Sequence, residues 1–292
     1  MTPTDNMLAK IINWANKEEP IRALILTGSR AGKGPVDELS DFDVSVFSET
    51  HEPYTQDDQW LSHLDIVWVY IPEKVDFGDA VYPSRLVIFK QGVKVDFIFY
   101  TVDVLAGLVN RALPDWLNIG YQVLLDKDGM AARLARPTFD SREAKRPTEQ
   151  DLRNLVREFW FEAYHVAKYL HREELWLVKS REQGIKDSLL LKMIEWHEQS
   201  RHDWKYDTRF EGKHMQAWVD GGVWESLHKT FSHFDSQDSW NALFATTTLF
   251  RQLATETADA LGFAYPHEVD SNISQFIQST SRLERNTGEE AR

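Results

Sequence analysis

The sequence predicts an α+β protein with a mixed N-terminal domain and a C-terminal helical bundle. Short β-branched runs alternate with amphipathic segments up to about residue 135, whereas helical periodicity alone continues after residue 148. A polar, proline-containing segment at 135–147 separates the two patterns. The length of 292 residues corresponds to about two domains of roughly 150 residues each. We therefore expect one domain at residues 1–136 and a helical domain at 148–292.

The N-terminal elements follow from periodicity and turn residues. An apolar helical face begins near Leu8, and Gln91-Gly92 predicts a tight hairpin because glycine adopts positive φ at little cost. A helix is also expected at 104–113. Strands are expected at residues 21–27, 41–47, 66–71, 85–90, 93–100 and 121–125.

The C-terminal domain should begin with a long amphipathic helix. Thr148 can cap its free backbone N–H groups, and apolar residues then recur every three or four positions up to Leu170. The pattern continues after Gly184, and segments 214–232 and 237–261 are also expected to be helical. From about residue 279 the chain is polar, which predicts a frayed end.

Composition excludes several classes of function. Lys and Arg number 33 against 46 Asp and Glu, and the net charge of -13 argues against a nucleic-acid partner, which would need a basic face. With no cysteine, disulfides and thiolate metal sites are excluded. We find no signal-peptide pattern and no run near the ~18 apolar residues of a membrane helix, so a cytoplasmic protein without a membrane partner is expected.

A turn after the first strand could bind phosphate. Gly28 would let the backbone approach a bulky anion, and Ser29 would offer a hydroxyl and an N–H group. Arg30 would add a fork of donors, and a helix beginning here would add the positive end of its dipole. Taken alone, these residues also fit an ordinary turn.

Three acids on two strands could hold a metal ion. Asp41 and Asp43 alternate with Phe42, so both carboxylates lie on one strand face, where Mg²⁺ would relieve their repulsion. Asp96 is a third acid, central in the apolar run 93–100. A close pair between Asp96 and Lys94 is not expected, because residues two apart on a strand are separated by about 7 Å, which only the long lysine side chain could bridge. Singly, each acid also fits a solvated sheet face.

Together, these features resemble the DNA polymerase β-like nucleotidyltransferase superfamily, which has a Gly-Ser turn after a strand, a D-x-D strand and a later strand with one acid. More narrowly, the chain resembles the aminoglycoside 6-adenylyltransferases, or streptomycin adenylyltransferases, over about residues 5–260. The segments that carry this resemblance are 24–47 (LILTGSRAGKGPVDELSDFDVSVF), 124–129 (LLDKDG), 158–179 (EFWFEAYHVAKYLHREELWLVK) and 190–197 (LLKMIEWH).

The resemblance implies a polymerase β-like domain with a mixed sheet flanked by helices, and a helical domain that closes the substrate cleft. It implies transfer of AMP from ATP to a hydroxyl of an aminoglycoside, streptomycin above all, which confers antibiotic resistance. Asp41 and Asp43 would hold Mg²⁺, while Asp96 would complete a second metal position and take the proton from the hydroxyl. Gly28 and Ser29 would seat the phosphates.

Four residues of the predicted helical domain are further candidates. Lys168 and Lys179 would bind phosphate. Glu158 and Glu162 are four residues apart on one helix face and could hold a small cationic antibiotic. All four also fit a solvated helix surface.

Alternatives remain open at this point. The acceptor could be another small molecule or a protein hydroxyl, or the chain could be a nucleotide-binding module without catalysis, although three intact acids argue against the latter. Phe42 stands where the family often has tyrosine, and the Gly32-Lys33-Gly34 loop also departs from the family pattern. The oligomeric state and the preferred base are not predicted.

Overall fold

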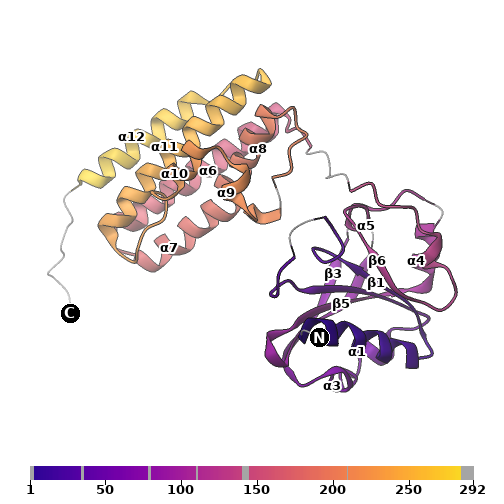
Figure 1. Ribbon diagram of the computed structural model, residues 1–292. Helices are drawn as coiled ribbons and strands as arrows, with labels where there is room; N and C mark the ends of the chain where they lie inside the picture. Colours follow the sequence, from indigo (N-terminus) through magenta and orange to yellow (C-terminus); the bar gives the residue numbers. More distant parts are fainter. Residues whose placement is uncertain are drawn as a thin grey trace, which may run out of the picture. The chain divides into compact units, whose positions relative to one another are not determined.

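The computed structural model describes residues 3–33, 36–77, 80–109, 111–139, 145–208 and 210–283. It comprises two compact units, Met1–Ser141 and Arg142–Arg292. The first is built on a six-stranded sheet and the second on helices, which confirms the predicted α+β class (Figure 1). Within these ranges, none of the helices has both the length and the apolar character needed to cross a bilayer.

The sheet is mixed and has the strand order β3-β4-β5-β2-β1-β6. Strands β2 and β5 are parallel, and the other neighbours are antiparallel. Their bounds are Ile21–Thr27 (β1), Phe42–Ser48 (β2), Val67–Asp76 (β3), Val81–Phe89 (β4), Lys94–Thr101 (β5) and Gln122–Asp126 (β6). The two strands that carry the acids, β2 and β5, are therefore neighbours in the middle of the sheet.

Helices cover both faces of this sheet (Figure 1). One face is covered by α1 (Pro3–Lys17), α2 (Glu52–Thr55) and α3 (Leu61–Leu64), and the other by α4 (Val102–Val109) and α5 (Asp115–Asn118). On β1, the side chains of Leu24 and Leu26 pack in the core with the first three helices, whereas those of Ala23 and Ile25 pack in the core with the other two. Because successive side chains of a strand point to opposite faces of the sheet, their position in the sequence decides which layer of helices they contact.

Most strand predictions hold, with shifted ends. The hairpin between β4 and β5 is confirmed: the short 3₁₀ turn Lys90–Gly92 has Gln91 at φ 68° and Gly92 at φ 76°. Strand β3 continues beyond the predicted end at residue 71, through Pro72. It lies at the sheet edge, where a missing N–H group is tolerated.

The helix predicted at 104–113 is shorter in the structure. Helix α4 ends at Val109, Asn110 lies outside the described residues, and 111–113 are not helical. Pro114 follows, and the residue before a proline is disfavoured in the helical region. After α5 and β6, a 3₁₀ turn at Ala131–Arg133 completes the described elements of this unit.

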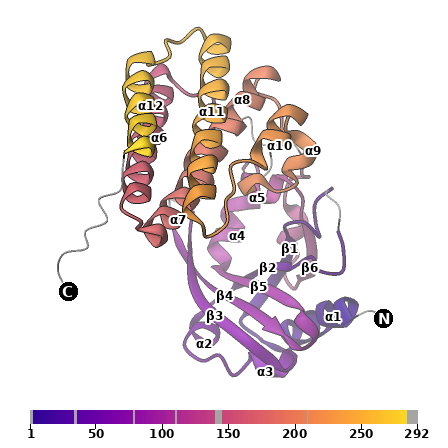
Figure 2. The ribbon, with the colours of Figure 1, turned by 90° about the vertical axis from the view of Figure 1, so that its left-hand side faces the viewer.

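The first helix of the second unit begins at the predicted residue. Thr148 caps α6 (Glu149–His171) in a reciprocal capping box with Asp151. The following elements are α7 (Leu175–Gly184), a π-helical turn η3 (Ile185–Leu190), α8 (Leu191–Arg201), a 3₁₀ turn (Phe210–Gly212), α9 (Met215–Trp218), α10 (Gly221–Leu227), α11 (Ser236–Leu261) and α12 (His267–Arg282). In Figure 2, α6, α11 and α12 run alongside one another, and they pack together through a shared core.

Two helical predictions are wrong in detail. The segment 214–232 contains two short helices, because Asp220 accepts a hydrogen bond from Gly222 N–H and starts α10 afresh. The chain is not frayed at 279–282, because α12 runs to Arg282 and buries Ile277 and Thr280. Residues 284–292 lie outside the described part.

Candidate active site

Gly28 is the point at which β1 turns toward the acids. Its φ is +67°, and a Cβ atom built there would lie 1.8 Å from Oδ2 of Asp43. The Gly28 carbonyl accepts hydrogen bonds from Ala31 N–H (3.2 Å) and Gly32 N–H (3.1 Å). The loop is therefore a closed turn and not the start of a helix, so the expected contribution of a helix dipole is absent from this turn.

Arg30 holds the loop that leads into β2. Its Nε donates to the carbonyls of Ser40 (2.9 Å) and Asp41 (3.1 Å), and Nη2 donates to those of Ser40 (2.6 Å) and Asp37 (3.3 Å). The guanidinium carbon also lies 4.3 Å from the centre of the Phe42 ring. The donor fork that we expected to face phosphate is directed at the backbone just before the paired acids, and so positions them.

The sheet register brings the acids together. Asp43 on β2 is the direct partner of Asp96 on the parallel strand β5, so both side chains leave the same sheet face. On the other side, Asp43 pairs with Thr27, whose hydroxyl donates to the Asp43 carbonyl at 3.3 Å. Asp41 lies one residue before β2. The strand parity expected from the sequence thus places the three acids at one end of β2 and β5.

Lys94 joins two of these acids, contrary to the sequence-based expectation. Its Nζ lies 2.8 Å from Oδ2 of Asp41 and 2.8 Å from Oδ2 of Asp96. The prediction against this pair relied on the strand rise between residues two apart. The four-carbon side chain bridges that distance and reaches both carboxylates.

Burial and these ion pairs shift the ionisation of the site. Burial lowers the pKa of Lys94, but its hydrogen bonds to Asp41 and Asp96 outweigh that effect and raise the pKa to about 12. For Asp96, burial is the largest influence and raises the pKa, although Lys94 opposes it. Oδ1 of Asp96 is buried and has no hydrogen-bond partner among the described residues.

Asp41, Asp43 and Asp96 are the residues that could hold a hard divalent cation. Among the residues that the structure describes, no three acidic or histidine side chains converge as a ready metal site, and an ammonium lies between Asp41 and Asp96. The donors are nevertheless all carboxylate oxygens, as Mg²⁺ prefers, and the buried oxygen of Asp96 still requires a partner.

Gly120 supports the Gly28 loop and was missed in the sequence. Its φ is +131°, and a Cβ atom there would lie 2.5 Å from the Ala31 carbonyl oxygen and 2.8 Å from Cα of Gly32. A glycine directly before a strand was the available signal. Lys33 lies 4.1 Å above the centre of the Phe139 ring, and Gly34 is outside the described residues.

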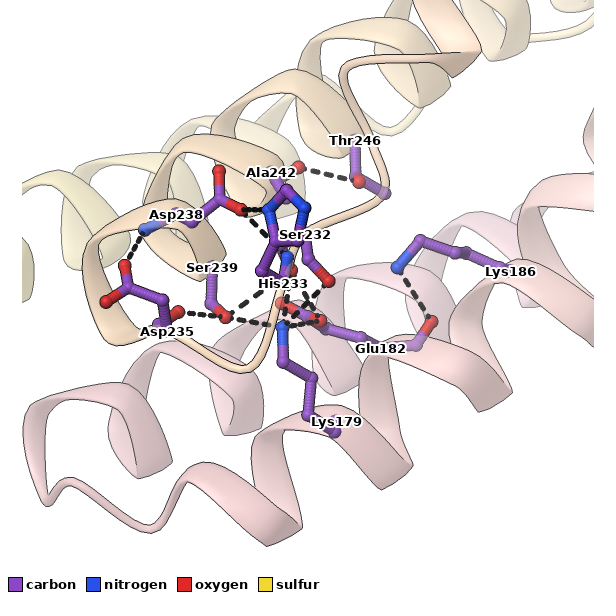
Figure 3. A network of polar contacts seen from close by, with 10 residues as sticks. All are labelled: Lys179, Glu182, Lys186, Ser232, His233, Asp235, Asp238, Ser239, Ala242 and Thr246. Carbon is purple, nitrogen blue, oxygen red and sulfur yellow. Dashed lines mark hydrogen bonds and ion pairs between the residues drawn. The ribbon is translucent and has the colours of Figure 1, made fainter.

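In the helical unit, Lys179 is the centre of a polar network (Figure 3). Its Nζ donates to the hydroxyls of Ser232 (2.6 Å) and Ser239 (2.7 Å) and to Oε2 of Glu182 (3.2 Å). Glu182 is buried, and its Oε1 has no hydrogen-bond partner within the described ranges. Lys179 is therefore held in a defined position, unlike an ordinary surface lysine.

Lys168 is placed differently. Its ammonium lies 5.1 Å from the centre of the Tyr164 ring, one helical turn earlier on α6. It is half-buried and is not part of the network around Lys179.

The two predicted substrate acids lie at one cavity of the helical unit. This cavity has a volume of about 390 Å³, and its polar lining includes Glu158, Glu162, Ser180, Arg181 and Ser188. Glu162 forms an ion pair with the Arg181 guanidinium, and Glu158 is exposed. The structure thus brings both acids to one cavity and shows one of them bound to a guanidinium.

Comparison with known sequences decides the family. The sequence pattern of the family described as streptomycin adenylyltransferase matches residues 1–280. This chain belongs to the streptomycin adenylyltransferase family. It is therefore an enzyme, a nucleotidyltransferase, as the sequence predicted.

This member of the streptomycin adenylyltransferase family is also similar to individual proteins. It is 27% identical over 286 residues to the aminoglycoside 6-adenylyltransferase of Bacillus subtilis (strain 168), covering 95% of this chain and 98% of that protein. It is 27% identical over 271 residues to the enzyme of the same name from Campylobacter jejuni, covering 91% and 92%. A solved aminoglycoside 6-adenyltransferase from Bacillus subtilis aligns over 95% of this chain and 98% of that chain, with 23% identity and a TM-score of 0.45.

Proposed function

We propose that this enzyme transfers AMP from ATP to a hydroxyl of an aminoglycoside, most specifically streptomycin, and thereby confers resistance. Family membership supports adenylyl transfer. The observation that carries the assignment of the site is the register of β2 and β5, which sets Asp43 beside Asp96 with Asp41 joined to Asp96 through Lys94.

In the proposed reaction, the substrate hydroxyl oxygen bonds to the α-phosphorus of ATP while the bond to pyrophosphate breaks. Asp96 accepts the hydroxyl proton. Its Oδ2 is held by Lys94 at 2.8 Å, and Oδ1 has no hydrogen-bond partner among the described residues. Burial, which raises the pKa of Asp96, makes the carboxylate a stronger base.

The nucleotide is assigned to the Gly28 loop and the paired acids. Gly28 and Ser29 seat the phosphates, and Arg30 holds the backbone before Asp41 in place. Asp41 and Asp43 would hold Mg²⁺, which when bound supplies positive charge to offset the triphosphate. These acids thereby serve to orient the α-phosphoryl group.

The helical unit is assigned two roles. Lys168 and Lys179 are the proposed sources of positive charge for the phosphates; the Lys179 ammonium would have to exchange its bonds to Ser232, Ser239 and Glu182 for bonds to phosphate. Glu158 and Glu162 hold the cationic acceptor. Streptomycin carries two guanidinium groups, and the ion pair of Glu162 with Arg181 already places a guanidinium at this cavity.

The acceptor assignment predicts a response to charge and salt. A Glu158→Gln/Glu162→Gln double variant should have a higher KM for streptomycin, and this KM should depend less on salt. The reason is that the variant lacks the two carboxylates whose attraction for the cationic antibiotic is screened by salt. Glu149→Gln, on the same helix but paired with Arg153, is the matched control. An unchanged streptomycin KM in the double variant would remove the two acids from the acceptor site and leave adenylyl transfer in place.

A different hydroxyl-bearing acceptor is the second candidate. Pyrophosphate release from Mg·ATP distinguishes the two. Release that requires an aminoglycoside supports the proposal, whereas release that requires a different small molecule or a protein changes the acceptor. A failure to release pyrophosphate with any acceptor would contradict catalysis.

We also propose a cytoplasmic location, where ATP is available.

A further inference from the structure

Lys94 occupies the position of a cation between two acids of the site. Its Nζ contacts Oδ2 of Asp41 and Oδ2 of Asp96 at 2.8 Å each. These contacts join a residue before β2 to a residue within β5, so the ammonium bridges the two strands at the end that carries the site. A divalent ion that used these two oxygens would have to displace the ammonium.

The position of Lys94 is set by the sheet. It is the first residue of β5, and its backbone pairs with Ile88 on β4. Its side chain is one third exposed, and it shares a strand face with Asp96. The ammonium is thus delivered by a regular strand that is hydrogen-bonded on both sides.

The charge already present between two of the acids favours one divalent ion over two. The Lys94 ammonium supplies a positive charge between Asp41 and Asp96. A second divalent ion between Asp41 and Asp96 would have to approach the ammonium within a few ångströms, where like charges repel strongly at a partly buried site. Displacing Lys94 would also leave an ammonium without its two partners.

We propose that the Lys94 ammonium takes the place of a second divalent cation, so that this enzyme binds one divalent ion with its nucleotide. Lys94 is then a positioning residue that holds Asp41 and Asp96 toward each other. The inference rests on the proposed Mg·ATP reaction and replaces the second metal position that the sequence led us to expect at Asp96.

Counting bound Mn²⁺ tests this directly, independently of activity. The spin signal of free Mn²⁺ would be titrated with protein in the presence of an ATP analogue with a methylene bridge between the α- and β-phosphorus atoms. The wild-type chain should bind one ion. Lys94→Met should bind two, and Lys94→Arg, which keeps the charge, should again bind one.

Lys10→Met is the matched control, because it removes another half-buried lysine–carboxylate pair, with Asp65, from the same unit. It should bind one ion. If the melting temperature of Lys94→Met is well below that of Lys10→Met, Lys94→Gln serves as the neutral variant in its place. Two ions in the wild-type chain, or one in both neutral Lys94 variants, would overturn the inference. The absence of nucleotide-dependent Mn²⁺ binding in every protein would instead contradict the metal-dependent function.

Discussion

Replacing Gly28 by alanine tests the packing of the loop against the acids. At φ +67° an alanine costs about 1–2 kcal/mol in the backbone alone. In addition, the new Cβ would lie 1.8 Å from Oδ2 of Asp43, about 1.6 Å short of an ordinary contact of 3.4 Å. Asp43 or the loop must therefore shift by more than 1 Å.

Such a displacement should be costly for catalysis. A misplacement of about 1 Å at a reacting group can lower the rate about 100-fold. We therefore expect Gly28→Ala to reduce kcat/KM by about two orders of magnitude, measured as pyrophosphate release. The free energy of unfolding in urea should fall by about 1–2 kcal/mol from the backbone cost.

Gly129 provides the matched control. It has the same φ of +67° and lies in the same unit, but a Cβ atom there would meet nothing within 4 Å. Gly129→Ala should lose similar stability and keep its activity. If Gly28→Ala retains activity within about threefold, or if Gly129→Ala loses as much activity, the contact with Asp43 does not explain the glycine.

Three further predictions test separate roles. Asp43→Asn should lower turnover by orders of magnitude while the melting temperature stays equal or rises, because acid–acid repulsion is relieved; near-normal activity with Mg·ATP would contradict the assignment. Asp96→Asn should lower kcat about 10²- to 10⁴-fold with little change in the KM for ATP; calorimetry showing lost Mg·ATP binding would make Asp96 mainly a metal ligand. Burial opposes ionisation of Asp270, but hydrogen bonds from Arg251 prevail and lower its pKa. This stabilisation should be present above about pH 4 and be lost as the pH falls through the lowered pKa. Asp270→Ala should therefore lower the free energy of unfolding in urea by about 2 kcal/mol at pH 7 and by less at pH 3. As a control, Lys192→Ala removes the ion pair with Glu195 and should lower it by less than about 1 kcal/mol. Equal losses for Asp270→Ala at both pH values would refute the role of its ion pair.

The local parts of the site were predictable from the sequence. Strand alternation placed Asp41 and Asp43 together and gave the parity of Asp96, because side-chain direction along a strand depends only on neighbouring positions. A turn at Gly28 was also expected from the local sequence, and the structure gives this glycine a φ of +67°. That Asp43 and Asp96 are register partners required the parallel pairing of β2 with β5, which only the structure gives.

Contacts made by long side chains were not predictable. Lys94 reaches two carboxylates across neighbouring strands, and Arg30 turns its donors to backbone carbonyls of the loop before β2. Lys179 meets Ser232 and Ser239, more than fifty residues later in the chain. Such partners are set by tertiary packing, so residue spacing alone could not identify them.

The last helix of the described chain also depends on tertiary packing that its local sequence did not indicate. The chain is polar from about residue 279, so a frayed end was expected there, but helix His267–Arg282 continues through residues 279–282. Its apolar residues nevertheless recur at Val269, Ile273 and Ile277, one helical face that packs on the core of the second unit. Burial of that face stabilises the helix beyond what its composition suggests.

The most direct test of the central claim is mass spectrometry of streptomycin after incubation with the enzyme and Mg·ATP. We expect a product that carries one added AMP on its streptidine ring, formed together with an equal amount of pyrophosphate. The Asp43→Asn variant should form none under the same conditions. Streptomycin that remains unmodified after long incubation at saturating Mg·ATP would contradict this acceptor.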